Sequence, residues 1–372
     1  MSIIWRAAAL LLLCMGTWAR AQGGESSNQE PPGTRPPAHA SAAVPDALAD
    51  MPLWAYGITA PPQPGDTAVP QGWGRRFDPA IGRDEQLRPV LHVPGSSRAY
   101  ALVDLSDWGN VVDWFPHEHA PMPDVVQHGS VALGEKKRAC AFCHRISGGG
   151  RPENAPVAGL PVEYFLRQLE DFRSGRRHST DPRKPNVPTM IEIARALSPN
   201  EARAAAEYYA MQSGAPRFRI IESDRAPPLE LRGNLFVAVG RERTEPLTDR
   251  IAEVLDGEDD RFYDNPHVGY MAFVPIGSIE RGRVLASASS ADPQTAVLTA
   301  AQACTACHGS DLHGLGPAPP LAGRSPSYLV RQLYDFKTGA RDGSLAPLMR
   351  PVVRRLSTPQ MTDIAAYIAS LP

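Results

Sequence analysis

The sequence predicts a mainly α-helical protein in which one small module occurs twice. The first observation is an internal repeat: residues 140–177 align without a gap with residues 304–341, an offset of 164 (304 minus 140). Repeats of this kind are decisive for the architecture of a chain. The second observation is that apolar residues in both copies recur at helical spacing, without the alternation that is typical of strands.

The two copies share a long pattern. "CAFCHRISGGGRPENAPVAGLPVEYFLRQLEDFRSGRR" matches "CTACHGSDLHGLGPAPPLAGRSPSYLVRQLYDFKTGAR". After a loop that is longer in the first copy, "VPTMIEIARALSPNEARAAAEYYAMQ" matches "APLMRPVVRRLSTPQMTDIAAYIASL". Each module holds roughly 85 to 95 residues, which is small for a domain that depends on its own core. A large buried cofactor would complete such a core.

Two helices can be placed in each copy. One apolar face is predicted for a helix that we expect to end near Gly175, formed by Val162, Phe165, Leu166, Leu169 and Phe172. The last helix of each copy begins with a capping box, a serine followed three residues later by Glu or Gln. The pairs are Ser198 with Glu201 and Ser357 with Gln360.

The N-terminus is typical of a signal peptide. One early charge, Arg6, precedes an apolar run of about ten residues, and Ala19-Arg20-Ala21 fits cleavage before Gln22. An uncleaved membrane anchor is the alternative, but a spanning helix needs roughly 20 apolar residues. We therefore expect export to the periplasm.

Composition and the repeat divide the chain into six parts. These are a signal peptide (1–21), a Pro-rich disordered tail (22–75), an extension packing on the first module (76–119), module 1 (120–214), an inter-domain segment (215–289) and module 2 (290–372). Outside the modules we expect irregular structure, with short strands at the runs "NLFVAVG" and "VGYMAFVPIG" of the inter-domain segment. The formal net charge of -2 shows no excess of basic residues, which excludes a nucleic-acid-binding footprint.

Each module contains a C-x-x-C-H motif, formed by Cys140, Cys143 and His144 and by Cys304, Cys307 and His308. This motif is the attachment signature of c-type haem: the thiols bind the porphyrin edge and the histidine binds the iron. A redox dithiol would need a βαβ context that is missing. A single zinc site joining both cysteine pairs would leave the histidines unexplained. The motifs therefore favour two haem c groups.

Methionine is the expected sixth ligand of both irons. Met190 and Met349 occupy equivalent places, each in the loop before the last helix and each preceded nearby by proline. His178 could compete in the first copy. Two irons with His and Met ligands have no open coordination site, so we expect outer-sphere electron transfer between redox proteins rather than catalysis.

Three further features have weaker implications. Arg177 and Arg341 are candidates to pair with haem propionates, although exposed arginines are often only solvated. The equivalent tyrosines and glutamines Tyr164, Gln168, Tyr328 and Gln332 could line the haems or the contact between modules. His117 and His119 lack further metal ligands nearby, which favours a surface or packing role.

On these motifs the chain resembles the tandem dihaem branch of the class I cytochromes c, the c4 type. The resemblance covers about 120–213 and 290–372 and is stronger in the second copy. It implies two mostly helical domains, each with one covalent haem, and electron transfer between redox proteins in the bacterial periplasm. A membrane respiratory complex is one of the partners that the resemblance suggests. It also implies that Pro319, and Ala155 in the first copy, offer a carbonyl to the ligating histidine. The alternatives are a cytochrome subunit of a membrane-bound dehydrogenase or oxidase, and a dihaem peroxidase or thiosulfate-oxidising enzyme.

Overall fold

The computed structural model describes residues 50–61, 63, 65–67, 83–86, 88–213, 218–232, 235–240, 243–256, 265–288 and 297–372. All described residues belong to one compact unit. The expected signal peptide lies outside the described residues. Within the described part of the chain, no helix has the length and apolar character needed to cross a membrane.

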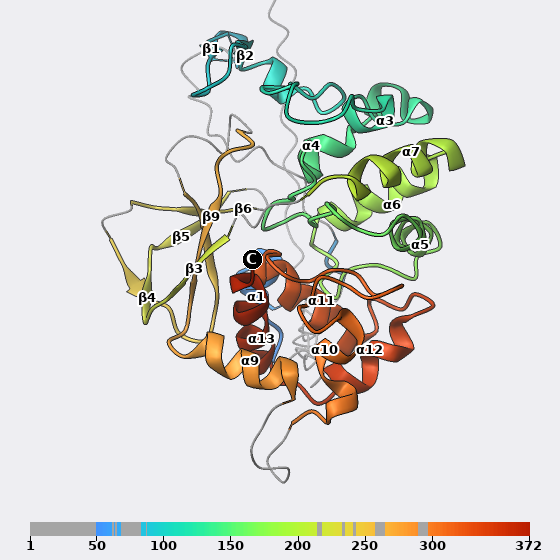
Figure 1. The fold of residues 1–372 in the computed structure, drawn as a ribbon. Coiled ribbons are helices and arrows are strands. Elements are labelled where there is room, and N and C mark those ends of the chain that lie inside the picture. The colour runs from blue at the N-terminus through green and yellow to red at the C-terminus, as the bar shows by residue number, and fades with distance from the viewer. Residues whose placement is uncertain are drawn as a thin grey trace, which may run out of the picture. The chain divides into compact units, whose positions relative to one another are not determined.

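Module 1 is a group of helices around one apolar core (Figure 1). Its helices are α3 (Asp124–Gln127), α4 (Cys140–His144), α5 (Val162–Arg173), α6 (Asn186–Ala196) and α7 (Pro199–Ala210), with a 3-10 segment, η3 (Val131–Lys136), before α4. Helix α5 packs on both α6 and α7. It ends two residues before Gly175, so the helix expected from the apolar spacing of residues 162–172 is confirmed.

Module 2 repeats this arrangement. A short 3-10 segment, η4 (Ala300–Gln302), precedes α10 (Cys304–His308), α11 (Pro326–Thr338), α12 (Ala346–Val353) and α13 (Thr358–Ser370). The largest core cluster surrounds α11 and α13 and contains the fully buried Tyr334, Met361 and Ile364. The mainly helical, duplicated fold is therefore confirmed.

Both predicted capping boxes are present. The Ser198 hydroxyl accepts a hydrogen bond from the Glu201 amide, and the Glu201 carboxylate accepts one from the Ser198 amide. Ser357 and Gln360 make the same pair of contacts at the start of α13. These contacts satisfy amides that would otherwise have no partner at a helix N-terminus.

The expectation that both methionines lie in loops is wrong. Met190 lies in α6 and Met349 in α12. The nearby prolines do not prevent helix formation. Pro188 lies in the first turn of α6 and Pro347 in the first turn of α12, where the amide of a residue has no intrahelical partner to lose. Helix α12 is shorter than α6, and it contains a second proline, Pro351, in its interior.

The inter-domain segment is more regular than expected. Its main sheet has the order β3-β9-β8, formed by β3 (Phe218–Glu222), β8 (Ala252–Leu255) and β9 (Tyr270–Val274), with β3 parallel and β8 antiparallel to β9. Two smaller pairs are β4 (Arg225–Ala226) with β7 (Glu245–Pro246) and β5 (Leu229–Arg232) with β6 (Leu235–Ala238). The two apolar runs noted in the sequence form β6 and β9.

The inter-domain segment also contains a helix that was not predicted, α9 (Ser278–Ser287). It lies against α13, the last helix of module 2 (Figure 1). A Cβ atom added at Gly282 would come within 1.9 Å of the Asp363 carbonyl oxygen. The missing side chain is therefore what lets the two helices approach so closely.

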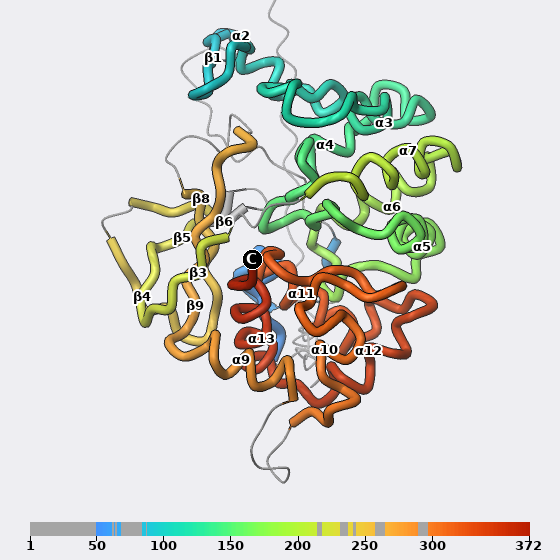
Figure 2. The backbone as a smooth tube through the Cα atoms, in the orientation of Figure 1, coloured from blue at the N-terminus to red at the C-terminus, as the bar shows by residue number. Residues whose placement is uncertain are grey.

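Residues 50–58, which fall in the expected tail, are packed against module 2. They contain α1 (Leu53–Tyr56), where Tyr56 is 1% exposed. The Tyr56 hydroxyl donates to Asp335 Oδ1 at 2.7 Å, and Arg331 donates to the Ala55 carbonyl at 2.6 Å. Helix α1 contacts α11, although the two are far apart in the sequence. Figure 2 draws the blue N-terminal segment among the orange and red helices of module 2. Disorder is thus not a property of the whole 22–75 range, because these apolar residues are buried.

The extension before module 1 has little regular structure. It contains α2 (Arg83–Gln86), the two-residue strands β1 (Val90–Leu91) and β2 (Tyr100–Ala101), and the 3-10 turn η2 (Asp104–Ser106). A small cluster of Val93, Trp114 and Phe115 forms its core. Trp108 stacks on Phe142 of α4 at 5.2 Å, and the Ala139 amide donates to the Trp108 carbonyl at 2.7 Å. The extension therefore rests on the C-x-x-C-H helix of module 1.

Candidate cofactor site

One cavity of about 360 Å³ between the modules brings the predicted site residues together. Its wall includes all eight of them: Cys140, Cys143, His144, Met190, Cys304, Cys307, His308 and Met349. The remaining wall is mostly apolar, which is typical of a site for a large organic cofactor.

The two histidines are held in the same way. His144 Nδ1 donates to the Ala155 carbonyl and His308 Nδ1 to the Pro319 carbonyl, both at 2.8 Å. A carbonyl oxygen can only accept, so the proton is on Nδ1 and Nε2 is left for a metal. The expected carbonyl contact is present in both copies, because replacing proline by alanine does not change the backbone oxygen.

A glycine turn sets the position of each carbonyl. Gly150 and Gly314 are equivalent residues with φ of +68° and +94°. Their amides donate to the carbonyls of His144 and His308. A Cβ atom at Gly150 would lie 2.6 Å from the Pro156 nitrogen. Only glycine tolerates both this backbone conformation and this close approach.

Burial keeps the thiols and imidazoles uncharged. It raises the pKa of Cys140 to about 12, with a further contribution from Cys143, and raises the pKa of Cys304 to about 11. Burial also lowers the pKa of both His144 and His308. The imidazoles are therefore neutral, which is the form that binds metals. Among the described residues the four cysteines form no disulfide.

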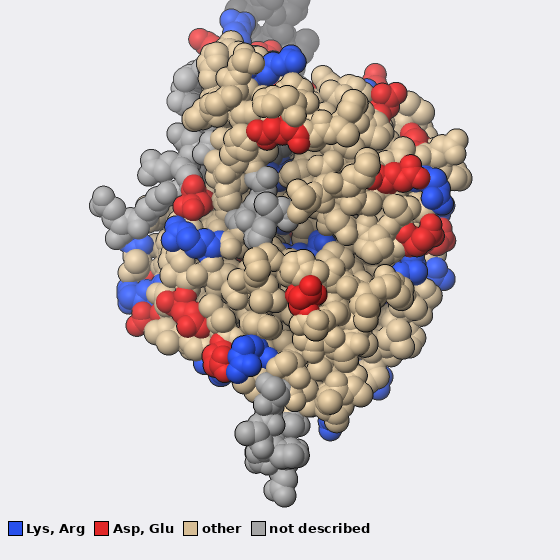
Figure 3. Space-filling view, in the orientation of Figure 1, with Lys and Arg blue, Asp and Glu red and all other residues tan. Residues whose placement is uncertain are grey.

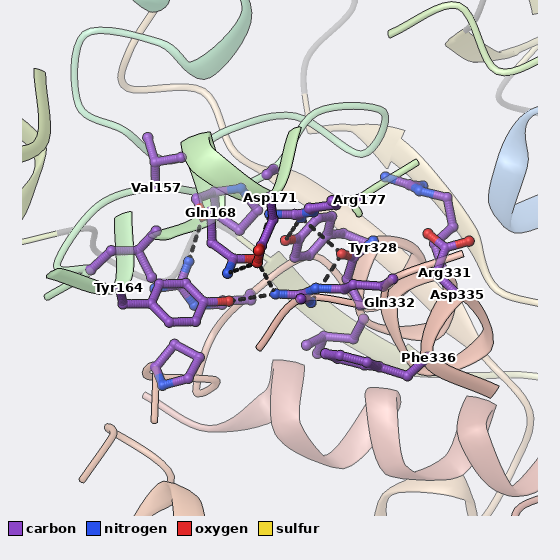
Figure 4. A pocket seen from close by; sticks show the side chains of 18 of the residues that line it. Val157, Tyr164, Gln168, Asp171, Arg177, Tyr328, Arg331, Gln332, Asp335 and Phe336 are labelled. Carbon is purple, nitrogen blue, oxygen red and sulfur yellow. Dashed lines mark hydrogen bonds between the residues drawn. The ribbon is translucent and has the colours of Figure 1, made fainter. Parts of the chain in front are cut away.

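A symmetric set of hydrogen bonds joins the modules across this cavity (Figure 4). Arg177 donates to Gln168 of its own module at 2.9 Å and to Gln332 of the other at 2.9 Å. Arg341 donates to Gln332 at 3.1 Å and to Gln168 at 2.7 Å.

The tyrosines complete this network. Arg341 donates to the Tyr164 hydroxyl at 2.6 Å and Arg177 to the Tyr328 hydroxyl at 3.3 Å. Two opposed effects act on the pKa of Tyr328: burial raises it, and the nearby guanidinium groups, Arg177 among them, lower it. Together the guanidinium groups outweigh burial, so the pKa lies below its usual value. The tyrosines and glutamines therefore form the contact between modules, and both arginines are buried rather than solvated.

The residues present fit haem c. The side chains that line the cavity include six basic residues (Arg167, Arg177, Lys184, Arg324, Arg331 and Arg341) and only three acidic ones (Glu153, Asp171 and Asp335). An excess of buried positive charge suits the propionates of two haems. Two donors on the wall, Arg167 Nε and Ser179 Oγ, are buried without a hydrogen-bond partner. Propionate oxygens would satisfy such donors.

Two arginines of the site were not identified from the sequence. Arg324 donates to the carbonyls of Pro156 and Ala158 in module 1, at 2.7 and 3.0 Å. Arg331 donates to the Pro152 carbonyl at 2.7 Å as well as to α1. Comparison of the copies offered one signal, since module 1 has Leu160 where module 2 has Arg324.

His117 and His119 do not line the cavity. His119 lies 2.8 Å from the Ala120 carbonyl and 3.3 Å from Asp113, and His117 is exposed next to Phe115. Among the described residues no group of three His, Cys, Asp or Glu side chains could hold a metal ion. His178, the competing ligand, lines the cavity, but its Nδ1 lies 3.2 Å from the Ser179 carbonyl.

The chain is similar to known c-type cytochromes. The family model "Cytochrome c" matches residues 295–372. The chain is 41% identical over 240 residues to the "Thiosulfate dehydrogenase electron acceptor" of Stutzerimonas stutzeri, covering 63% of this chain and 79% of that protein. It is 40% identical over 249 residues to cytochrome c4 of Pseudomonas aeruginosa, covering 65% of this chain and 89% of that protein.

Other matches are partial. The match to cytochrome c-552 of Acidithiobacillus ferridurans is 44% identical but spans 18% of this chain and 29% of that protein. Among solved structures, the thiosulfate dehydrogenase from Marichromatium purpuratum matches with 29% identity and a TM-score of 0.43, covering 66% of this chain and 38% of that one.

The duplicated C-x-x-C-H turns, the oriented imidazoles and the cavity between two helical modules define a dihaem c-type electron-transfer cytochrome. The identity to full-length relatives is more specific: the chain belongs to the cytochrome c4 family. The cofactor is accordingly haem c, with two copies in this tandem architecture.

Proposed function

We propose that the protein carries electrons between redox partners in the periplasm through two haem c groups. Cys140, Cys143, Cys304 and Cys307 would hold them covalently, and the axial ligands would be His144 with Met190 and His308 with Met349. The observation that supports the proposal is that all eight of these residues lie on the wall of one cavity. Bound in this way, haem iron supplies reversible one-electron exchange.

The chain's own residues prepare this exchange. The carbonyls of Ala155 and Pro319 fix each imidazole ring and leave Nε2 directed away from the backbone. The apolar wall limits access of water to the cofactor, and a methionine ligand favours ferrous iron. Both effects would stabilise the reduced state. The arginine network fixes one module relative to the other and hence the separation of the two sites.

Replacing one methionine tests the ligand set. Met349→Ala should remove the charge-transfer absorption of a methionine–ferric haem pair from module 2 and lower one of two reduction potentials, because a ligand that favours ferrous iron is lost. Spectroscopy and redox titration of the holoprotein measure both effects.

Met211→Ala is the matched control, since Met211 is exposed at the end of α7. It should leave the spectrum and both potentials unchanged. An unaltered spectrum in the Met349→Ala protein would show that another side chain binds this iron.

A second candidate function is favoured by one relative. The protein of Stutzerimonas stutzeri is named as an electron acceptor of thiosulfate dehydrogenase. On this reading, the chain would receive electrons from such an enzyme rather than oxidise thiosulfate itself. Thiosulfate alone should then leave the oxidised holoprotein unchanged, and thiosulfate with a catalytic amount of the dehydrogenase should reduce it.

The absorbance change of the haem on reduction distinguishes an acceptor of the dehydrogenase from an enzyme that oxidises thiosulfate itself. Reduction by thiosulfate without any added enzyme would identify the chain as a thiosulfate-oxidising enzyme. No reduction in the presence of the dehydrogenase would leave the general carrier function but would reject this donor.

A further inference from the structure

The loop that precedes the methionine-bearing helix is longer in module 1 than in module 2. Arg177 and Met190 are 13 positions apart (190 minus 177), whereas the equivalent Arg341 and Met349 are 8 apart (349 minus 341). Surface loops tolerate insertions at little cost, so the additional length alone implies no function. The contacts of residues 178–185, which we call the long loop, are more informative, because they reach both module 2 and the segment that contains α1.

The long loop binds module 2 at a buried carboxylate. Thr180 donates to Asp335 Oδ1 from its amide at 3.0 Å and from its hydroxyl at 2.8 Å. Asp335 is 5% exposed. A carboxylate with so little access to water depends on protein donors, so the contact with Thr180 stabilises the junction of the two modules.

The long loop also binds the segment that follows α1. Arg183 forms a two-pronged pair with the fully buried Asp181, through Nε at 2.9 Å and Nη2 at 2.6 Å. The same guanidinium donates to the Ala60 carbonyl at 2.6 Å and lies 3.6 Å from the Asp66 carboxylate. Because a guanidinium is planar, the pair with Asp181 also fixes the direction in which Arg183 reaches Ala60.

Helix α1 is anchored on module 2 at the same carboxylate that binds the long loop. The Tyr56 hydroxyl donates to Asp335 Oδ1, the oxygen that also accepts from Thr180. Just before α1, the Asp50 carboxylate accepts hydrogen bonds at 3.0 and 3.1 Å from two residues of α11, Tyr334 and Lys337. The segment that begins at Asp50 is therefore bonded to module 2 at its start and to module 1 further along.

Surface charge contributes little to the junction on the face drawn in Figure 3. Charged side chains lie mainly toward the edge of that face rather than along the line where the modules meet. Exposed ion pairs are in any case weak. The buried contacts of Tyr56, Asp335 and Asp181 are therefore the stronger ones.

We propose that residues 50–61 together with Asp66, which we call the clamp, hold the two modules at one separation, with Arg183 as the positioning residue of module 1. The modules cannot move apart without breaking the contacts of the clamp at one of its ends. The additional residues of the long loop are the part of module 1 that the clamp binds. The purpose of the clamp rests on the electron-carrier function: a fixed separation keeps constant the distance over which an electron passes between the two iron sites.

Hydrogen exchange of the reduced holoprotein reports separation of the modules directly. Two backbone amides bond across the junction: His178 donates to the Ala340 carbonyl at 2.8 Å, and Asp342 donates to the Arg176 carbonyl at 2.7 Å. These two junction amides exchange when the modules part, whereas amides inside α7 and α13 exchange when a module itself opens.

Arg183→Lys is the test variant. Lysine keeps a positive charge beside Asp181 but lacks the planar fork that binds Asp181 and Ala60 together. The exchange rates of the two junction amides should rise about fivefold to tenfold, because hydrogen bonds between the clamp and module 1 are lost. The amides inside α7 and α13 should exchange as in wild type.

Arg173→Lys is the matched control. Arg173 donates to two backbone carbonyls of its own module, those of Ala194 and Leu197, both at 3.0 Å. The same substitution here removes contacts within module 1 and should leave the junction amides within about twofold of wild type. Tyr56→Phe, at the other end of the clamp, should raise exchange of the junction amides about twofold to fivefold, because Asp335 loses one donor.

Three results would overturn the clamp. These are unchanged exchange of the junction amides in Arg183→Lys, an equal acceleration in Arg173→Lys, and an acceleration in Arg183→Lys that extends equally to α7 and α13. The last would mean a general loss of stability. Hydrogen exchange involves no electron transfer, so each of these results leaves the carrier function standing. A holoprotein that could not be reversibly reduced and oxidised would instead reject the carrier function and leave the clamp.

Discussion

At the scale of single residues, hydrogen-bond geometry distinguishes side chains that look equivalent in the sequence. Tyr164 and Tyr328 occupy the same place in the two modules, yet the distance from each hydroxyl to its arginine is 2.6 Å for Tyr164 and 3.3 Å for Tyr328. A charge-assisted bond weakens as it lengthens, so the two hydroxyls should contribute unequally to stability.

Removal of each hydroxyl tests this difference. Tyr164→Phe should lower the free energy of unfolding by about 1.5 kcal/mol, and Tyr328→Phe by about 0.5 kcal/mol. Chemical denaturation of the holoprotein, followed by far-ultraviolet circular dichroism, measures both, and each variant is the control of the other. Equal losses would mean that the two arginine contacts are equivalent in solution.

At the scale of elements, close packing explains why α9 lies where it does. Gly282 faces the Asp363 carbonyl across the contact with α13, and Arg281 forms an ion pair with the Asp363 carboxylate at 2.8 Å. The ion pair also raises the pKa of Arg281, through its hydrogen bond to Asp363. Glycine is unfavourable in a helix by itself, so its presence in the middle of α9 reflects this contact.

Gly282→Ala should therefore destabilise the protein, although alanine is the better helix former. The added methyl group has no room, and overpacking of this kind costs about 1 to 3 kcal/mol. Thermal unfolding of the holoprotein measures the loss. Arg283→Ala, on the exposed side of the same helix, should change stability by no more than about 0.5 kcal/mol. An increase in stability for Gly282→Ala would contradict the close approach of α9 and α13.

Two helices of each module were predictable from the sequence, whereas α6, α12 and the helices outside the modules were not. Helix α5 has a continuous apolar face, and α7 and α13 have capping boxes, so local pattern and final structure agree. Helix α1 has only four residues and is stabilised by burial of Tyr56 against α11, a contact between distant parts of the chain. No local pattern can report such a contact.

At the scale of the whole molecule, the sequence predicted eight residues that line the cavity but not the contacts that join the two modules. The motifs and their repetition identified eight residues, and all eight line the cavity. The contacts of the buried Arg324 and Arg331 could not be foreseen, because their partners are backbone carbonyls of module 1 and of α1. Backbone acceptors exist at every residue, so only the fold shows which of them an arginine reaches.

The crossed arginine contacts have a consequence for the duplication itself. Each arginine donates to the glutamine of its own module and to the glutamine and tyrosine of the other module. Every contact from module 1 to module 2 in this network is therefore matched by the equivalent contact from module 2 to module 1. This is the rule of an isologous, two-fold interface. A single module already contains both halves of the contact. The fused chain therefore preserves, within one polypeptide, the geometry of a homodimer.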